Sequence, residues 1–235
     1  MCQKSNEIVL DNVSFAYGDN VIFKDFNTVF SRGINVVLGK SGCGKTTLLN
    51  IITGVVDYTG KCLSAPPSVV LSEPTLAPVS VENNVRIILG KNCSGQVDEA
   101  LKLAHIADKR KQNALTLSDG EKQRVSLARA FACSRSVMLL DEPFSRLDYG
   151  VKRQLYDTLI EYLQNKNITA LLVTHDVDEA LTLADRIYFL SNKPCTISQV
   201  AELTELRGER NIYDGQHSEI RKKLQNLLLD STSES

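Results

Sequence analysis

The chain opens with short alternations of apolar and polar residues. Between Ile8 and Phe30, runs such as Val13-Ser14-Phe15-Ala16-Tyr17 stand next to the turn-forming cluster Gly18-Asp19-Asn20. Alternation with a period of two is typical of strands that bury one face, and the cluster supplies a turn between two of them. The segment therefore predicts an antiparallel hairpin region, which forms an N-terminal β subdomain.

Four later runs are continuous rather than alternating. They are short and mostly apolar, at residues 34–38, 137–140, 169–173 and 187–190. Strands of a parallel sheet are buried on both faces and have this character, and helical patterns separate the later runs as βαβ units require. We expect the four runs to lie side by side in one mainly parallel sheet, which makes the fold class α/β.

The region between residues 72 and 135 has a helical pattern and little strand character. Candidate helices cover 81–89, 96–107 and 119–133. Ser118-Asp119-Gly120-Glu121 has the spacing of a capping box at the start of the third helix, and Asp148 and Asp176 each stand where a helix needs an N-cap. We interpret the region as a helical subdomain inserted between two strands of the sheet.

We expect residues 1–235 to form a single domain that ends in a short helix and a frayed tail within about 216–235. An apolar stripe on one face of that helix consists of Ile220, Leu224, Leu227 and Leu228. The stripe is interpreted as packing onto the domain, with binding to a partner as the alternative.

The charge balance excludes some functions. The 235 residues contain 27 Lys and Arg against 28 Asp and Glu, so there is no excess of positive charge for a charge-driven nucleic-acid binder. The N-terminus is polar, and no apolar stretch approaches the roughly 20 residues that cross a bilayer, so we expect a chain that does not span a membrane by itself. The six cysteines are scattered without a CxxC pair, as expected of reduced thiols in a cytosol.

The most informative motif is Gly39-Lys40-Ser41-Gly42-Cys43-Gly44-Lys45-Thr46, between a predicted strand and a predicted helix. It matches the phosphate loop Gly-x4-Gly-Lys-Ser/Thr. In such a loop the glycines let the backbone approach a phosphate, the lysine bridges the β- and γ-phosphates, and the hydroxyl is offered to Mg²⁺. The candidate nucleotide-binding residues are Gly39, Ser41, Gly42, Cys43, Gly44, Lys45, Thr46 and Thr47, with Lys45 also assigned to catalysis.

A pair of carboxylates follows the run at 137–140. Asp141 leaves the end of a predicted buried strand, so Asp141 and Thr46 are the candidate residues for holding Mg²⁺. Glu142 is next and is the candidate general base for the attacking water, a role that typically contributes about 10²–10⁴-fold in rate. Together the two motifs predict binding and hydrolysis of a nucleoside triphosphate.

Three further segments carry a family resemblance. Leu117-Ser118-Asp119-Gly120-Glu121 and its continuation to Ala130 resemble the signature segment of ATP-binding cassette (ABC) ATPases. Ser145-Arg146-Leu147-Asp148 resembles the D-loop of that family, and Thr174-His175-Asp176 resembles its switch-histidine segment. The resemblance covers nearly the whole chain and implies a P-loop NTPase core with an antiparallel β subdomain and a helical signature subdomain.

The resemblance also implies a partner. In this family two cassettes stack head to tail, so each ATP lies between the phosphate loop of one cassette and the signature of the other. Ser118, Gly120 and Glu121 are therefore expected to contact the ATP of a second subunit, in a homodimer. His175 is expected to contact the γ-phosphate and to orient the water beside Glu142.

Two side chains receive additional expectations. Tyr17 matches the aromatic residue that stacks on adenine in the family, with an ordinary strand tyrosine as the alternative. Cys43 lies near a helix N-terminus and Lys45, both of which favour the thiolate, so it is expected to be a maleimide-sensitive thiol that ATP protects.

Three departures from the family's pattern are found: the Trp that importers of the nitrate, sulfonate and taurine kind often carry after the proline is missing from Leu76-Ala77-Pro78-Val79, and Ser72 and Asp119 fall at expected nucleotide contacts. Ser72 stands where the family usually has a glutamine that touches Mg²⁺ and the attacking water, and a serine reaches as far only through a bridging water. Asp119 replaces the first glycine of the usual Leu-Ser-Gly-Gly, which is unfavourable near a γ-phosphate unless the side chain points away or caps the helix. We expect reduced hydrolysis, with harmless drift in a working ATPase as the alternative.

The pattern is most similar to importers of the nitrate, sulfonate and taurine kind. It implies an ATP-hydrolysing subunit on the inner face of the cell membrane that powers uptake of a small solute through separate permease subunits. A solute-binding protein is an indirect partner, and no nucleic acid is expected.

Two other hypotheses remain at this point. A soluble ABC ATPase of DNA repair or translation normally needs a long coiled-coil insertion or a second cassette, and the chain has neither. A partly degenerate cassette, the regulatory half of an asymmetric pair, is suggested by Ser72 and Asp119.

Overall fold

The computed structural model describes residues 6–90, 93–191, 193–203, 205, 210, 212–213 and 215–230. Cys2, the rest of the polar start up to residue 5, and the frayed tail predicted for 231–235 lie outside these residues.

The larger of two sheets carries all four predicted buried runs. Its strand order is β5-β6-β7-β3-β8-β9, and every neighbouring pair is parallel except β8 and β9. The strands are β3 (Gly33–Leu38), β5 (Ser68–Val70), β6 (Val137–Asp141), β7 (Thr169–Thr174), β8 (Arg186–Leu190) and β9 (Ile197–Glu202). The prediction of one mainly parallel sheet is confirmed, whereas β9 was not predicted.

The predicted hairpin is also present. Strands β1 (Ile8–Tyr17) and β2 (Asn20–Phe30) pair antiparallel, and β4 (Thr59–Leu63), which was not predicted, adds to β1 in a second sheet. Gly60 in β4 has φ of 95°, and a Cβ there would lie 2.2 Å from the carbonyl oxygen of Asn12. Only glycine therefore allows β4 to approach β1 so closely.

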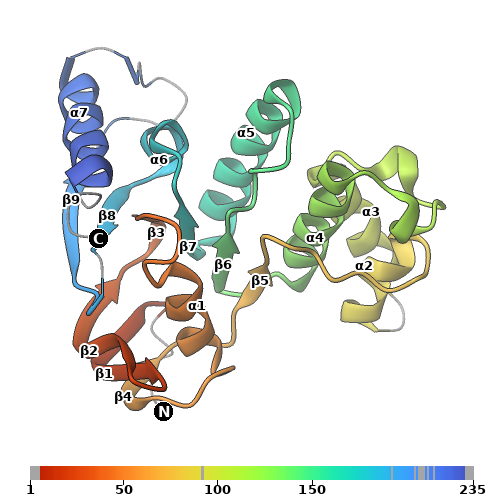
Figure 1. The fold of residues 1–235 in the computed structure, drawn as a ribbon. Coiled ribbons are helices and arrows are strands. Elements are labelled where there is room, and N and C mark those ends of the chain that lie inside the picture. Colours follow the sequence, from red (N-terminus) through yellow and green to blue (C-terminus); the bar gives the residue numbers. More distant parts are fainter. Residues whose placement is uncertain are drawn as a thin grey trace.

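The elements form three layers (Figure 1). The antiparallel sheet and α1 (Lys45–Thr53) cover one face of the larger sheet, and α5 (Tyr149–Lys166), α6 (Val177–Leu183) and α7 (Gly215–Asp230) cover the other. Successive strand residues alternate between these two cores: Leu171 of β7 packs with α1, and Leu172 packs with α5. Burial on both faces explains why these strands read as continuous apolar runs.

The C-terminal stripe packs as expected. In α7, Leu224 is fully buried, and Ile220, Leu227 and Leu228 are partly buried against the main core. The interpretation that this helix packs onto the domain is therefore confirmed.

The helical region projects beyond β5 at one edge of the large sheet (Figure 1). It contains α2 (Val81–Leu89), α3 (Ser94–Leu103), α4 (Asp119–Cys133) and two short 3-10 segments, Ala107–Lys109 and Ala114–Thr116. The helix predicted at 96–107 is wrong at its end, because α3 stops at Leu103. His105 adopts a left-handed φ of 50°, and the resulting reversal places Ile106 in the core at full burial.

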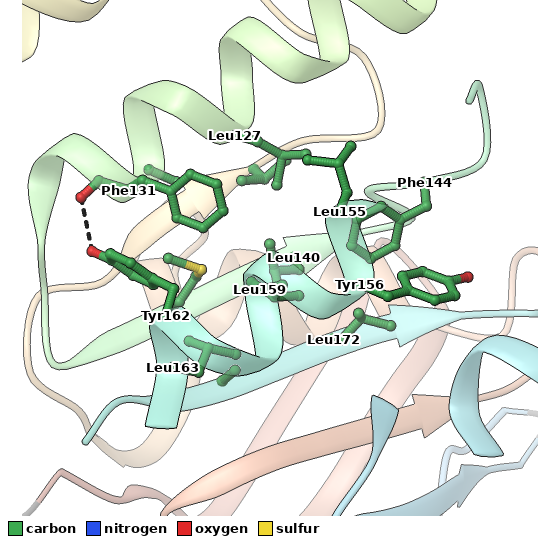
Figure 2. Close-up of a cluster of buried hydrophobic side chains, with 14 of the residues drawn as sticks. Leu127, Phe131, Leu140, Phe144, Leu155, Tyr156, Leu159, Tyr162, Leu163 and Leu172 are labelled. Carbon is green, nitrogen blue, oxygen red and sulfur yellow. Dashed lines mark hydrogen bonds between the residues drawn. The ribbon is translucent and has the colours of Figure 1, made fainter. Parts of the chain in front are cut away.

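Helix α5 connects the helical region to the large sheet. Figure 2 shows Leu159 and Tyr162 of α5 in one cluster with Phe131 of α4 and with Leu140 and Leu172 of the strands. The Tyr162 hydroxyl donates a hydrogen bond of 2.8 Å to the carbonyl of Phe131, and the two rings lie 4.7 Å apart. The C-terminal end of α4 is thereby fixed to the sheet through α5.

Candidate nucleotide-binding site

Three loops of the site leave neighbouring strand ends. Strand β7 lies between β6 and β3, and all three run parallel. Because Leu38 is paired with Thr174 and Asp141 with Val173, the phosphate loop, Glu142 and His175 emerge at the same carboxyl edge.

The phosphate loop has a backbone that only glycine accommodates at its last turn. Gly44 is the N-cap of α1 with φ of 119°, and a Cβ there would approach Cys195 Sγ to 3.0 Å and Ile22 Cγ2 to 3.1 Å. Lys45 is almost buried, and its Nζ donates hydrogen bonds to the carbonyls of Gly39 at 2.7 Å and Lys40 at 2.8 Å. The ammonium is thus held against the loop by weakly competing carbonyls, where a phosphate can replace them.

A cavity of about 320 Å³ opens above this loop. It is lined by Ser41, Gly42, Gly44, Lys45, Thr46, Thr47, Ser72, Asp141 and Glu142. The two sequence motifs therefore meet in one cavity, and Ser72 lies in it with them.

Asp141 is a buried carboxylate surrounded by hydroxyl donors. Thr46 Oγ1 donates to its Oδ2 at 3.3 Å, and Ser72 Oγ donates to the same oxygen at 3.5 Å. Burial raises the pKa of Asp141 and the Glu142 carboxylate adds to this, while Thr46, Lys45 and Ser72 oppose it. A hard cation would relieve this uncompensated charge, so the oxygen donors fit Mg²⁺.

Metal binding at this site depends on the phosphates of the bound nucleotide. Across the described ranges, no group of three or more His, Cys, Asp or Glu side chains is placed to hold a metal ion. Mg²⁺ usually takes one or two carboxylates and completes its shell with substrate phosphates and water, which is what Asp141 and Thr46 allow.

Glu142 and His175 form a pair at the rim of the cavity. His175 Nδ1 lies 3.0 Å from the Glu142 carboxylate, and the Glu142 amide donates to the carbonyl of Val173 at 3.0 Å. Glu142 has a left-handed φ of 44°, which costs a residue with a Cβ about 1–2 kcal/mol. Such strain is maintained where the surrounding structure fixes the backbone, here through the bond of the Glu142 amide to β7.

The expectation that the surroundings of Cys43 favour its thiolate is wrong, whereas its labelling by maleimide and protection by ATP stay predictions. Cys43 is buried in the core beneath the loop, and burial raises the pKa of its thiol although Lys45 and the amides of the helix start oppose the effect. Its carbonyl accepts a hydrogen bond from Cys195 Sγ at 2.7 Å. The five described cysteines are all free thiols, as expected.

Tyr17 is half-exposed at the end of β1 and packs edge-on against Phe15, with ring centroids 4.7 Å apart. It does not line the cavity. Its contact with adenine stays a prediction.

The signature residues lie on a different element. The Ser118 side chain accepts the Glu121 amide at the start of α4, and the Ser118 amide donates to the Glu121 carboxylate at 2.8 Å. The predicted capping box is therefore confirmed. Gly120 lies against the backbone carbonyl of Arg146, and a Cβ at position 120 would lie only 2.9 Å from that carbonyl oxygen. None of the signature residues lines the cavity of its own chain, so their contact with ATP needs a second subunit and stays a prediction.

Sequence reasoning missed Arg146. Its guanidinium lies 3.6 Å from the Asp119 carboxylate and 3.3 Å from that of Glu73, while Lys122 approaches Asp119 at 3.5 Å. The resemblance located Arg146 in the D-loop segment, but no local pattern relates it to residues so far away in the sequence.

Comparison with known proteins decides the family. A family model described as ABC transporter matches residues 23–145, more than half of the chain. The chain belongs to the ABC transporter family.

Two relatives support this assignment of an ABC ATPase, and one solved structure shares the fold. The aliphatic sulfonates import ATP-binding protein SsuB 1 of Pseudomonas savastanoi pv. phaseolicola is 38% identical over 193 residues, covering 78% of this chain and 80% of that protein. The taurine import ATP-binding protein TauB of Shigella flexneri is 36% identical over 222 residues, covering 86% and 85%. A solved ATP-binding subunit of an ABC transporter shares the fold with a TM-score of 0.77 at 19% identity, covering 93% and 99%.

The protein is therefore an ABC ATPase, and ATP is its substrate. Among the described helices, none combines the length and the apolar character needed to cross a membrane.

Proposed function

We propose that this ABC ATPase powers import of a small organic sulfonate through separate membrane-spanning permease subunits, working as a head-to-tail homodimer at the inner face of the membrane. The names of the two relatives support the import reaction and the class of solute. The observation that carries the catalytic part is the convergence of Lys45, Asp141 and the Glu142–His175 pair at one sheet edge.

Each side chain has a role that follows from its place. Lys45 exchanges its carbonyl partners for the β- and γ-phosphates of ATP. Thr46 and Asp141 would hold Mg²⁺, which neutralises charge on the phosphates. Glu142 accepts the proton of the attacking water, and His175 holds the Glu142 carboxylate through Nδ1. When its ring is protonated, His175 also offers Nε2–H to a phosphate oxygen.

The second subunit supplies the remaining anion contacts. Ser118 and the amides at the start of α4 form a site of positive potential that does not line the cavity of its own chain. In a head-to-tail pair, this helix end meets the γ-phosphate of the partner's ATP. Asp119 does not prevent this arrangement, because Arg146 and Lys122 compensate its charge.

A groove of about 260 Å³ beside the helical region is the proposed seat of the permease. It lies between α4 and the segment after β5, with Leu71, Pro74 and Ile88 among its lining residues. Leu71 and Ile88 are partly exposed apolar side chains, and the Leu71 carbonyl accepts a bond of 3.1 Å from Gln123. Ser72, the next residue, hydrogen-bonds to Asp141. A permease that binds in the groove and shifts Leu71 would therefore also shift a residue of the nucleotide site.

ATP hydrolysis against protein concentration tests the catalytic proposal. For the wild type, the rate should rise more than linearly because two subunits form each site. Glu142→Gln should bind ATP, lose at least about 10²-fold in turnover and accumulate a dimer by light scattering. Glu161→Gln, which removes an exposed carboxylate from α5, should behave as the wild type.

Other outcomes contradict parts of this proposal. Full turnover by Glu142→Gln would remove Glu142 as the base. ATP binding without turnover or dimer in the wild type would instead favour the regulatory half of an asymmetric pair.

The permease seat has a separate test in cells that carry the natural transporter. Ile88→Glu should keep the ATPase rate of the isolated protein within about 2-fold and abolish uptake of labelled taurine, because a buried charge at an interface is costly. Uptake at the wild-type rate would place the permease elsewhere.

A further inference from the structure

The turn that carries His175 is held by a buried hydrogen-bond chain. Strand β7 ends at Thr174 and α6 begins at Val177, so His175 lies in a two-residue turn. The Thr174 hydroxyl accepts the Asp176 amide at 3.1 Å and lies 2.5 Å from Glu179 Oε2. Since a hydroxyl has one proton, Thr174 donates it to Glu179 Oε2 while accepting from the backbone.

Glu179 is an unusual residue to find at this place. Its side chain is only 3% exposed, and its Oε1 has no hydrogen-bond partner among the described residues. Lys152, whose charge acts on Glu179, pairs directly with Asp176 at 2.9 Å. A buried carboxyl with one bond and no direct counter-charge destabilises a fold relative to an apolar side chain. Stability alone therefore does not explain a glutamate here.

The side chain of His175 depends on the turn for its direction. His175 is 59% exposed, and its ring is bonded to Glu142 alone among the described contacts. Little packing restrains the ring, so the backbone at Thr174 and Asp176 decides where it points. On the other side of the turn, Asp176 Oδ1 accepts the amides of Asp178 and Glu179.

We propose that Glu179 is a positioning residue for ATP hydrolysis, which acts through Thr174 to hold the turn that directs His175 onto Glu142. The inference rests on the catalytic roles proposed for Glu142 and His175. It assigns to Glu179 no contact with the nucleotide.

The decisive measurement is the NMR spectrum of the histidine ring nitrogens in the nucleotide-free protein. The chain has three histidines, so His105 and His217 are internal references. Glu179→Met and Thr174→Val keep the size of each side chain but break the bond, and both should shift or broaden the His175 signals alone. Glu179→Gln should keep the His175 signals, because its amide oxygen still accepts the Thr174 hydroxyl.

Kinetics give an independent readout. Glu179→Met should lower kcat by at least about 10-fold while KM for ATP changes less than about 2-fold, because the nucleotide contacts remain. Glu179→Gln should stay within about 3-fold of the wild-type kcat. Asp178→Asn is the matched control, since this neighbouring carboxylate on α6 bonds Arg221 rather than Thr174.

Two results would overturn the inference. One is an unchanged His175 spectrum in both Glu179→Met and Thr174→Val. The other is a loss of activity in Glu179→Gln equal to that in Glu179→Met. Failure of the catalytic roles is distinguishable, because Glu142→Gln would then turn over normally whatever the histidine spectrum shows.

Discussion

The guanidinium of Arg146 lies 3.6 Å from the carboxylate of Asp119, the residue that replaces a glycine at the first turn of α4. Arg146 also pairs with Glu73 at 3.3 Å, so one cation serves two acidic groups from separate segments. Asp119 thus has its own counter-charge, and the N-terminal end of α4, the proposed anion site, is less negative than the sequence implies.

Removing this cation should weaken the ATP-bound dimer. In the proposed head-to-tail dimer, Arg146→Gln would leave Asp119 near the partner's γ-phosphate with only Lys122 as a counter-charge, and a repulsion of about 1 kcal/mol should raise the ATP concentration for dimer formation about 5-fold. Asp119→Gly in the same chain should restore the wild-type value. Light scattering at increasing ATP concentration measures dimer formation by both variants. If Arg146→Gln weakens dimer formation equally in chains with and without Asp119, the pairing of Arg146 with Asp119 is contradicted.

Ser72 should affect the magnesium requirement rather than the base. Its hydroxyl reaches Asp141 and not Glu142, so Ser72→Ala should raise the Mg²⁺ concentration for half-maximal ATPase several-fold with little change at saturation. Ser72→Gln restores the family's residue and should increase turnover. Identical Mg²⁺ titrations for wild type and Ser72→Ala would place Ser72 outside the metal site, and an unchanged rate in Ser72→Gln would indicate harmless drift.

The backbone strain at Glu142 can be measured without its carboxylate. At φ of 44°, Glu142→Gly should be more stable than Glu142→Ala by about 1 kcal/mol, because only glycine adopts this region without cost. In ordinary extended or helical backbone, the same exchange favours alanine. Urea unfolding of the two variants decides the sign, and a more stable alanine variant would show that the strain is absent in solution.

Glu179 should make stability depend on pH. Burial raises its pKa from 4.5 to about 7, so folding favours the protonated form. The stabilisation is complete below pH 4.5 and is lost as pH rises through 7, a change of about 3 kcal/mol. Relative to Glu179→Gln, the wild type should lose stability between pH 5 and 8 in urea unfolding. Parallel curves for the two proteins would show that Glu179 titrates normally.

Cys43 should react slowly with maleimides. Its thiol is buried and has a raised pKa, so labelling at pH 7.5 should be at least about 10²-fold slower than for free cysteine. Peptide mass spectrometry after labelling follows this site, with Cys43→Ser as the blank. Labelling as fast as free cysteine would restore the reactive thiolate expected from the sequence.

Local patterns predicted the elements whose stabilising contacts are local. Ser118 and Glu121 cap α4 within one turn, and the helix begins where their spacing places it. By contrast, β4 is mostly exposed and pairs through a glycine contact with Asn12, which no periodicity records. The prediction of a Cys43 thiolate failed for the same reason. Lys45 is close in the sequence, whereas the side chains that bury the thiol are distant in the sequence.

The bond between Tyr162 and Phe131 has a mechanical consequence. It fixes α4 near its C-terminal end, whereas Ser118 lies about 20 Å away along the helix axis. If the helical region turned about this fixed end, a tilt of about 10° would displace Ser118 by about 3.5 Å at this rise per residue. A displacement of that size exceeds the length of a hydrogen bond, so in the proposed head-to-tail dimer it would separate Ser118 from the partner's phosphate.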